Sequence, residues 1–126
     1  MNTLLTVSRA GPRMLFGEGQ SVEATGPFAP LGDGRYLAGF RASHLTIARK
    51  SPAALEFRTT VSVTEITGSE SFLHLHHGTD RWVGLVHGVH DLAAGSALTV
   101  YLDPAHVYLF AEDGALVAPA AYAMAA

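Results

Sequence analysis

Histidines are the residues of this chain best suited to chemistry, because imidazole can bind metal ions and transfer protons. His74, His76 and His77 lie within four residues, and His87 and His90 follow. On a strand, His74 and His76 project to one face and His77 to the other, so a zinc site could take two of them plus a ligand from a neighbouring strand. The chain has no cysteine and no H-E-x-x-H pattern. We therefore predict solvated histidines beside a turn and no metal site.

A nucleotide phosphate site is the second chemistry to test. A phosphate loop needs glycines whose backbone N–H groups wrap the phosphates, followed by a lysine and a hydroxyl. The chain has a single lysine, Lys50, with Ser51 after it, and the two loop glycines would have to stand where His44 and Arg49 stand. The loop is therefore absent, and we expect this chain neither to bind nor to hydrolyse ATP.

Other catalytic arrangements are weaker. Ser69, His87 and Asp91 supply the residue types of a hydrolytic triad, but no G-x-S-x-G elbow occurs. Glu65 and Glu70 flank a glycine turn, where two carboxylates are usually only solvated. Three aromatic residues could form a stacking platform for a sugar or a base, although strands more often place such side chains in a core: Trp82, Tyr101 and Tyr108. We predict no catalytic, cofactor-binding or metal-binding residue.

Composition predicts one globular domain. The 126 residues are 48% hydrophobic and 15% charged, with a net charge of −3. All eight basic residues lie at or before Arg81, so the last third is acidic, and we expect no nucleic-acid partner. The lack of cysteine fits a cytoplasmic protein, and neither a signal peptide nor an apolar run of membrane-spanning length is visible.

Two-residue alternation of apolar and polar side chains is the main structural signal. Residues 55–63 alternate as in a strand with one buried face. The phase breaks at Glu65-Ile66, which predicts a bulge or bend there, and Gly68 then marks a turn. The residues Gly78-Thr79-Asp80 predict a hairpin between two further strands. These and later strands are expected at 72–77, 81–87, 98–102 and 107–110.

The first part of the chain gives weaker strand signals, and no segment of helical length has a convincing helical period. Strand candidates there are 13–16, 20–24, 35–41 and 45–48. Many short strands with closely spaced turns indicate a sandwich or a small barrel, for example of the partly closed oligonucleotide/oligosaccharide-binding (OB) type. The Ala-rich tail from Ala118 to Ala126 is expected to fray.

Three segments carry recognisable motifs. Residues 36–45 are similar to a strand written G-I-R-P-E-H-L, and residues 65–70 to an E-x-L-G-x-E turn. Residues 95–110 with Gly114 are similar to G-x-x-V-x-L-x-F-D-P-x-x-x-H-L-F-D-x-x-T-G. In this order, and with the opening Met1-Asn2, they resemble the C-terminal half of the ATPase subunits of maltose/glycerol-3-phosphate-type ABC sugar importers. Four positions depart from the family pattern: Ala42, Ser43, Thr67 and Tyr108.

The resemblance implies an all-β domain, an OB-like barrel of the TOBE (MOP-like) type with additional N-terminal strands. It implies that residues 1–126 form one C-terminal regulatory domain from which the ATPase domain is absent. The motif residues would then have structural roles: glycines that allow close approach or a positive φ, an Asp-Pro pair that ends a strand, and a His and a Glu that bond local backbone. These positions are Gly39, Arg41, His44, Glu65, Gly68, Glu70, Asp103 and Pro104.

The same resemblance implies a non-catalytic regulatory and dimerisation role in an importer of sugar or glycerol-3-phosphate-like solutes. ATP and Mg²⁺ would belong to the parent subunit. The expected partners are a second copy, the permease-bound ATPase dimer and a cytosolic regulatory protein, at the cytoplasmic side of the inner membrane. A dimer patch is expected from residues 92–101, 109–110 and 115–117. The alternatives are a stand-alone oxyanion- or sugar-binding barrel of the molybdate-binding type, and a metal-binding cupin-like enzyme.

Overall fold

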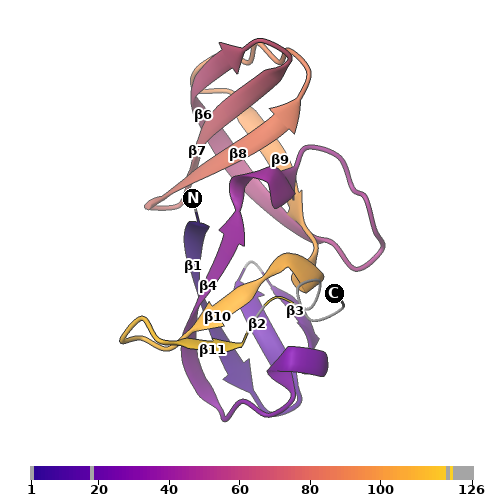
Figure 1. Cartoon of the computed structure of the whole chain (residues 1–126), viewed down its shortest axis with the longest axis vertical. Coiled ribbons are helices and arrows are strands. Elements are labelled where there is room, and N and C mark those ends of the chain that lie inside the picture. Colours follow the sequence, from indigo (N-terminus) through magenta and orange to yellow (C-terminus); the bar gives the residue numbers. More distant parts are fainter. Residues whose placement is uncertain (1, 18, 119, 121–126) are drawn as a thin grey trace. The chain divides into compact units, whose positions relative to one another are not determined.

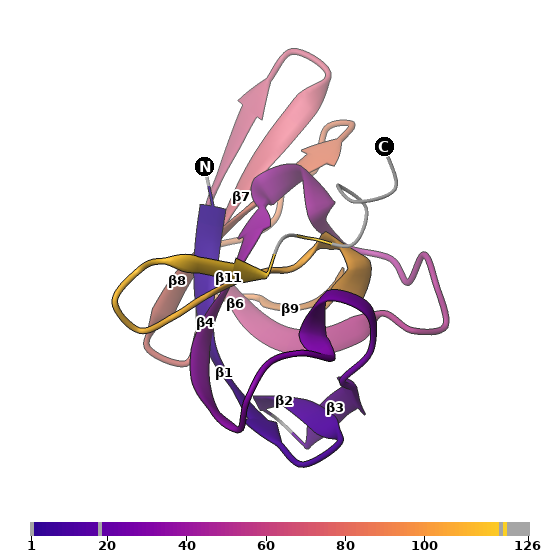
Figure 2. The same ribbon diagram turned by 60° about the horizontal axis from the view of Figure 1, so that its bottom comes forward.

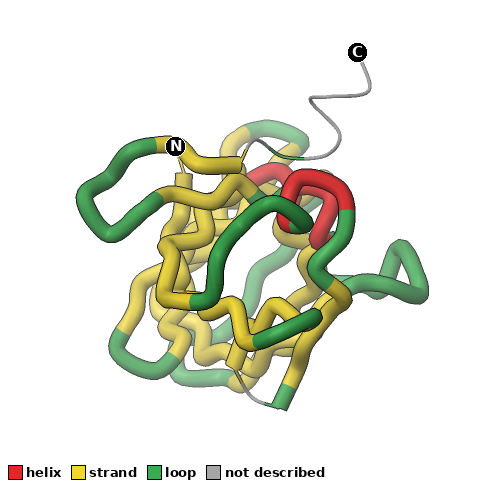
Figure 3. Tube along the Cα trace, turned by 90° about the horizontal axis from the view of Figure 1, so that it is seen from below, coloured by secondary structure: helices red, strands yellow, loops and turns green. Residues whose placement is uncertain are grey.

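The computed structural model describes residues 2–17, 19–118 and 120, and for residues 2–4 it describes the backbone alone. Within these residues the chain consists of strands, turns and short 3₁₀ helices (Figure 3). No helix in the described part is long and apolar enough to cross a membrane. The chain divides into two compact units, one built mainly from Arg41–Asp103 and the other from Leu4–Phe40 together with Pro104–Ala126.

The first unit is a five-stranded antiparallel sheet that curls into a nearly closed barrel (Figure 1). A 3₁₀ turn, η2 (Ala42–His44), leads into it. The order of strands across the sheet is β5-β9-β6-β7-β8. In chain order the strands are β5 (Leu45–Thr46), β6 (Leu55–Thr67), β7 (Glu70–His77), β8 (Asp80–His87) and β9 (Ala97–Leu102).

The barrel core comes from the inward-facing residues of the alternating strands. Large side chains with almost no exposure fill it, among them Phe57, Leu75 and Trp82. The barrel is closed by packing where its two end strands approach each other. A Cβ atom placed on Gly84 of β8 would lie 3.5 Å from Cδ2 of Leu45 in β5. The small residue at position 84 therefore lets the Leu45 side chain rest on β8.

A β-bulge at Ser62 reverses the faces of β6. Val61 is paired with Leu75 and Val63 with His74, so one residue is left over between them. Before the bulge the apolar residues of β6 point inward; after it Val63 points outward and is 53% exposed. The prediction of a bulge at Glu65-Ile66 is therefore wrong, because the extra residue lies three positions earlier and the ladder continues unbroken from Val63 to Thr67.

The second unit is a six-stranded sheet of order β11-β10-β4-β1-β2-β3 (Figure 2). It draws its strands from both ends of the chain, and two short 3₁₀ turns accompany them. The elements are β1 (Asn2–Ala10), β2 (Arg13–Gly17), β3 (Gln20–Glu23), η1 (Gly26–Phe28), β4 (Gly34–Arg41), η3 (Pro104–His106), β10 (Tyr108–Phe110) and β11 (Leu116–Ala118). Its core contains Met14, Phe16, Phe40 and Leu109.

Arg9 holds the loop after η1 against this sheet. Its guanidinium Nη1 donates to the backbone carbonyls of Phe28, Ala29 and Leu31 at 2.6–3.1 Å, and its Nε donates to the carbonyl of Gly11 at 2.8 Å. These carbonyls lie in irregular backbone, where no strand ladder supplies partners. The arginine therefore adds a donor to four carbonyls, of which that of Phe28 also accepts the Leu31 N–H at 3.2 Å.

The expected fold class, a small OB-like β-barrel with additional N-terminal strands, is confirmed. Every strand expected between residues 13 and 110 is present, although the one at 45–48 is only Leu45–Thr46. The sequence pattern does not predict β1, and it predicts 107–110 as the last strand, whereas β11 follows and pairs with β10. Met1, residue 119 and residues 121–126 lie outside the described residues, so the opening motif and the fraying of the tail are described only in part.

Candidate functional site

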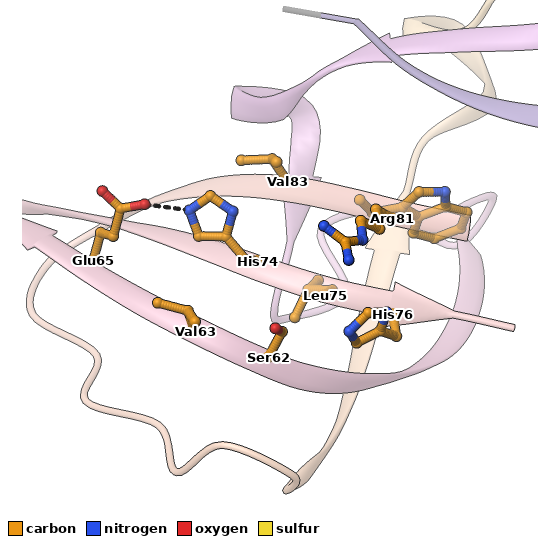
Figure 4. Close-up of a pocket in the computed structure, with 9 residues that line it drawn as sticks. Ser62, Val63, Glu65, His74, Leu75, His76, Arg81 and Val83 are labelled. Carbon is orange, nitrogen blue, oxygen red and sulfur yellow. Dashed lines mark hydrogen bonds and ion pairs between the residues drawn. The ribbon is translucent and has the colours of Figure 1, made fainter. Parts of the chain in front are cut away.

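The outer face of the barrel carries a groove across β6, β7 and β8 (Figure 4). Antiparallel pairing places Val63, His74 and Val83 in one row across the three strands. A cavity of about 290 Å³ lies over this row. Its lining consists of Ser62, Val63, Glu65, His74, Leu75, His76, Arg81, Trp82 and Val83. We call this surface the outer-face groove.

An ion pair lies at one end of the groove. Nε2 of His74 is 2.5 Å from Oε1 of Glu65, and Figure 4 shows the ring and the carboxylate facing each other. The bulge at Ser62 brings this about, because it turns Val63 and Glu65 to the same outer face as His74. Since both side chains are substantially exposed, solvent screens the pair, and its contribution is to orient the two groups more than to stabilise the fold.

Basic side chains lie at the other end of the groove. His76 is directly opposite Arg81 in the ladder between β7 and β8, and Thr60 of β6 lies on its other side. The side chains of His76 and Arg81 are both exposed. The groove therefore has the Glu65 carboxylate at one end, a guanidinium and an imidazole at the other, and His74 flanked by two valines between them. This arrangement can bind polar or charged groups. Ser62 also lines the groove, but no hydrogen bond of the described residues joins its hydroxyl to an imidazole.

A second hollow of about 390 Å³ continues the groove towards η2. The two hollows share Glu65, His74 and Val83. The second one adds Phe72 and Leu85 from the barrel wall and Arg41, Ala42 and Ser43 from the segment that enters the barrel. The groove thus becomes more apolar on this side, as is usual for surfaces that receive another molecule.

The histidines of β7 alternate as the sequence predicts. His74 and His76 are on the outer face, whereas the ring of His77 stacks on Trp82 with centroids 4.2 Å apart and planes at 14°. Phe57 meets both rings edge-on. Within the described residues, no group of three or more His, Asp or Glu side chains is arranged to hold a metal ion.

The other residues considered for chemistry are dispersed. The backbone of Ser69 accepts a hydrogen bond from the Gly88 N–H at 2.6 Å, but no hydrogen bond of the described residues joins the side chains of Ser69, His87 and Asp91. The three aromatic candidates do not share a surface. Trp82 is buried in the barrel core, Tyr101 lies under the guanidinium of Arg49, and Tyr108 belongs to β10 of the other unit.

The family-motif positions fall into three places. Glu65, Gly68 and Glu70 surround the hairpin turn between β6 and β7, where Gly68 has a φ of +62°. Gly39 pairs with Tyr108 across β4 and β10, followed by Arg41 at the end of β4 and His44 in η2. Asp103 and Pro104 follow β9, and η3 begins at the proline. Glu65 lines both the outer-face groove and the second hollow, and Arg41 lines the second hollow.

A family model described as the TOBE domain matches residues 38–110. The chain belongs to the TOBE domain family. The match begins in β4, covers all five barrel strands and ends in β10, so it includes the whole outer-face groove. TOBE domains are non-catalytic and typically serve as regulatory or ligand-binding domains of ABC transporter ATPases. No curated protein matches this chain.

Sequence reasoning found the histidines and Glu65 of this TOBE domain but not the other residues of its groove. Val63 was assigned to the buried face, because its alternation with Phe57 and Val61 continues unbroken in the sequence. Arg81 and Val83 were not singled out. Once β7 and β8 are recognised as a hairpin, however, the spacing of these two residues puts them on the face of His74 and His76.

Proposed function

We propose that this chain is the regulatory TOBE domain of the ATP-binding subunit of an ABC importer for sugar or glycerol-3-phosphate-like solutes. The observation that carries the proposal is the TOBE match over residues 38–110, within which the motif residues occur in the order of that importer family. The domain has no catalytic role of its own: ATP and Mg²⁺ bind in the parent subunit. The importer places it at the cytoplasmic side of the inner membrane.

The gene sequence directly upstream of Met1 tests this assignment. A phosphate loop encoded in the same reading frame, or an ABC ATPase gene next to it, is the expected result. An upstream region without either would contradict the proposal. Purified chain should also show no saturable ATP binding by calorimetry, since His44 and Arg49 occupy the positions of the two loop glycines. Micromolar binding would contradict the non-catalytic role.

The outer-face groove supports a contact role for the domain. Its exposed apolar residue Val63 lies between charged ends that include Glu65 and Arg81. We assign this groove to the regulatory partner, a cytosolic protein. In the parent importer, Val63→Asp is expected to abolish the effect of that partner on ATP hydrolysis and leave basal hydrolysis unchanged. Arg58→Asp, on the outer face of β6 outside the groove, serves as the control.

Self-association is the second contact that we propose. Leu116 and Val117 of β11 are 55% and 39% exposed, in agreement with a patch at 115–117. Leu109, expected in the same patch, is buried in the sheet core instead and contributes nothing to it. A weak, concentration-dependent homodimer is expected in sedimentation velocity, and Leu116→Glu should abolish it. A strict monomer at the highest soluble concentration would contradict this contact.

A further inference from the structure

We propose that the seam of the barrel between β5 and β8 is a binding site for a small organic anion, a carboxylate or phosphate monoester with an apolar portion. Across this seam the described strands have no ladder, because β5 and β8 are the two ends of the sheet. Leu45 closes it at Gly84. Beyond that contact the seam opens into a cavity of about 260 Å³.

The cavity combines an apolar floor with nitrogen and hydroxyl donors. Its lining consists of Ser43, Leu45, Thr46, Ile47, Ala48, Lys50, Leu85, Val86, His87 and His90. Among the described residues no carboxylate lines it, although Glu70 lies opposite His87 in the ladder. The lining thus includes an ammonium, two imidazoles and the hydroxyls of Ser43 and Thr46, the latter donating to the Ala48 carbonyl. Such a lining around one apolar space favours a ligand with an anionic head and a small hydrocarbon body.

The His90 wall of the cavity is held in place by a buried hydroxyl. Ser71, fully buried in β7, donates its hydroxyl to the Gly88 carbonyl at 2.8 Å and accepts the His90 N–H at 3.0 Å. The imidazole folds back so that Nε2 donates to the His87 carbonyl at 2.9 Å. A Cβ on Gly88, whose φ is +92°, would lie 3.4 Å from this Nε2. Position 88 therefore favours glycine for its backbone conformation. Because Nε2–H is used by the His87 carbonyl, the ring can donate to an anion only through a protonated Nδ1.

The Lys50 wall is held by its neighbour Arg49. The Arg49 guanidinium donates to the Ala54 carbonyl at 2.8 Å, lies 3.7 Å from a carboxylate oxygen of Glu56 and covers the ring of Tyr101. Ser51 tightens the loop by accepting the N–H of Ala53 on its hydroxyl. Lys50 is thus presented from an anchored loop, so that less of its conformational freedom is lost when it meets an anion.

This site shares no lining residue with the outer-face groove, and it shares only Ser43 and Leu85 with the second hollow. It does not depend on the importer assignment. The occupancy of such a site in a TOBE domain would follow the concentration of the anion, and the domain could thereby make the activity that it regulates depend on that concentration. The proposal requires only that the barrel bind the anion at the seam.

Amide NMR titrations of the whole chain test the site, with phenyl phosphate and benzoate as anions and benzyl alcohol as the neutral control. Saturable shifts at residues 43–50 and 85–90 are expected with at least one anion, and the tighter of the two identifies the head group. Inorganic phosphate should bind more weakly than phenyl phosphate, because it cannot use the floor of Leu45 and Leu85.

Variants localise the effect. Lys50→Gln is expected to weaken binding by about tenfold, the usual order for losing one charged hydrogen bond. His90→Gln should also weaken binding, because it removes an imidazole from the cavity wall. Ala48→Trp should block the cavity without removing a donor. Arg58→Gln changes the net charge as Lys50→Gln does but lies on the outer face of β6, and it should leave binding unchanged.

Three results would overturn the proposal. The first is no saturable shift at the seam with either anion at millimolar concentrations. The second is binding of benzyl alcohol as tight as that of the anions, which would show that the anionic head group is not recognised. Equally tight binding of inorganic phosphate would show that the apolar floor does not contribute. The third is wild-type affinity in the Lys50, His90 and Ala48 variants, provided that their dispersed spectra show that they are folded. An equal loss of affinity in Arg58→Gln would count in the same way.

Discussion

Arg9 shows how one side chain can satisfy backbone that has no ladder of its own. Its guanidinium donates to four carbonyls, three of them in the segment 28–31. We expect Arg9→Met to lower the free energy of unfolding by about 2 kcal/mol, because four carbonyls lose a charged donor and two of these hydrogen bonds are part-buried. Urea denaturation measures this. Arg35→Met, on an exposed position of β4, is the control, and an equal loss in both variants would contradict the role of Arg9.

The pair of Glu65 and His74, unlike Arg9, is expected to contribute little to stability. Its two side chains are 58% and 38% exposed, so its coupling free energy should be below about 1 kcal/mol despite the short contact. A double-mutant cycle with Glu65→Gln and His74→Gln, read by urea denaturation, measures this coupling. A coupling free energy well above about 2 kcal/mol would mean that the pair mainly stabilises the fold. It would contradict the view that the pair mainly orients the two groups in the groove.

The hairpin between β6 and β7 depends on its turn. Gly68 has a φ of +62°, a conformation that costs other residues free energy, and nothing lies within 4 Å of a Cβ placed there. Gly68→Ala should therefore destabilise the chain by about 1 kcal/mol through backbone strain alone. Thermal unfolding measures it. Gly32→Ala, which has equal space and no positive φ, should be nearly neutral, and equal effects would exclude the strain explanation.

A strand can be predicted from the sequence when its own residues alternate between buried and exposed positions, and not when only its pairing with another strand defines it. The alternation at Leu55, Phe57 and Val61 predicts β6 because that face is buried from Leu55 to Val61. In β11 both Leu116 and Val117 are exposed, so no periodicity marks it; only its pairing with β10 makes it a strand. In β1 the buried pair Leu5 and Val7 is too short a pattern to stand out.

The candidate sites were harder to predict for a similar reason. The histidine cluster was expected to be merely solvated, yet two of its members line the outer-face groove. The bulge at Ser62 decides which neighbours join them, and nothing in the local pattern specifies where the extra residue lies. Lys50 and His90 are 40 positions apart, and the curling of the sheet brings β5 and β8 together. The register of the strands and the closure of the barrel depend on contacts between distant residues, so they are hard to predict from a single sequence.

On the scale of the whole molecule, the barrel is a continuous insertion in a discontinuous unit. The five barrel strands all come from residues 41–103, whereas the other unit draws strands both from 4–40 and from the segment that begins at residue 104. Because the barrel has its own core, including Phe57, Leu75 and Trp82, we expect a fragment of residues 41–103 to fold alone. A dispersed NMR spectrum with strand-type circular dichroism is the expected result, and a random-coil spectrum would contradict it.

The insertion also decides how the chain would bear tension. The chain enters the barrel from β4 and leaves it towards β10, and these strands are hydrogen-bonded to each other with Gly39 opposite Tyr108. A force applied to the two ends of the chain can pass from β4 to β10 through this pair without entering the barrel. In an optical-tweezers experiment, the six-stranded sheet should therefore rupture first, and the barrel should stretch only after the β4–β10 pair has opened. The barrel is mechanically shielded by the two strands that connect it.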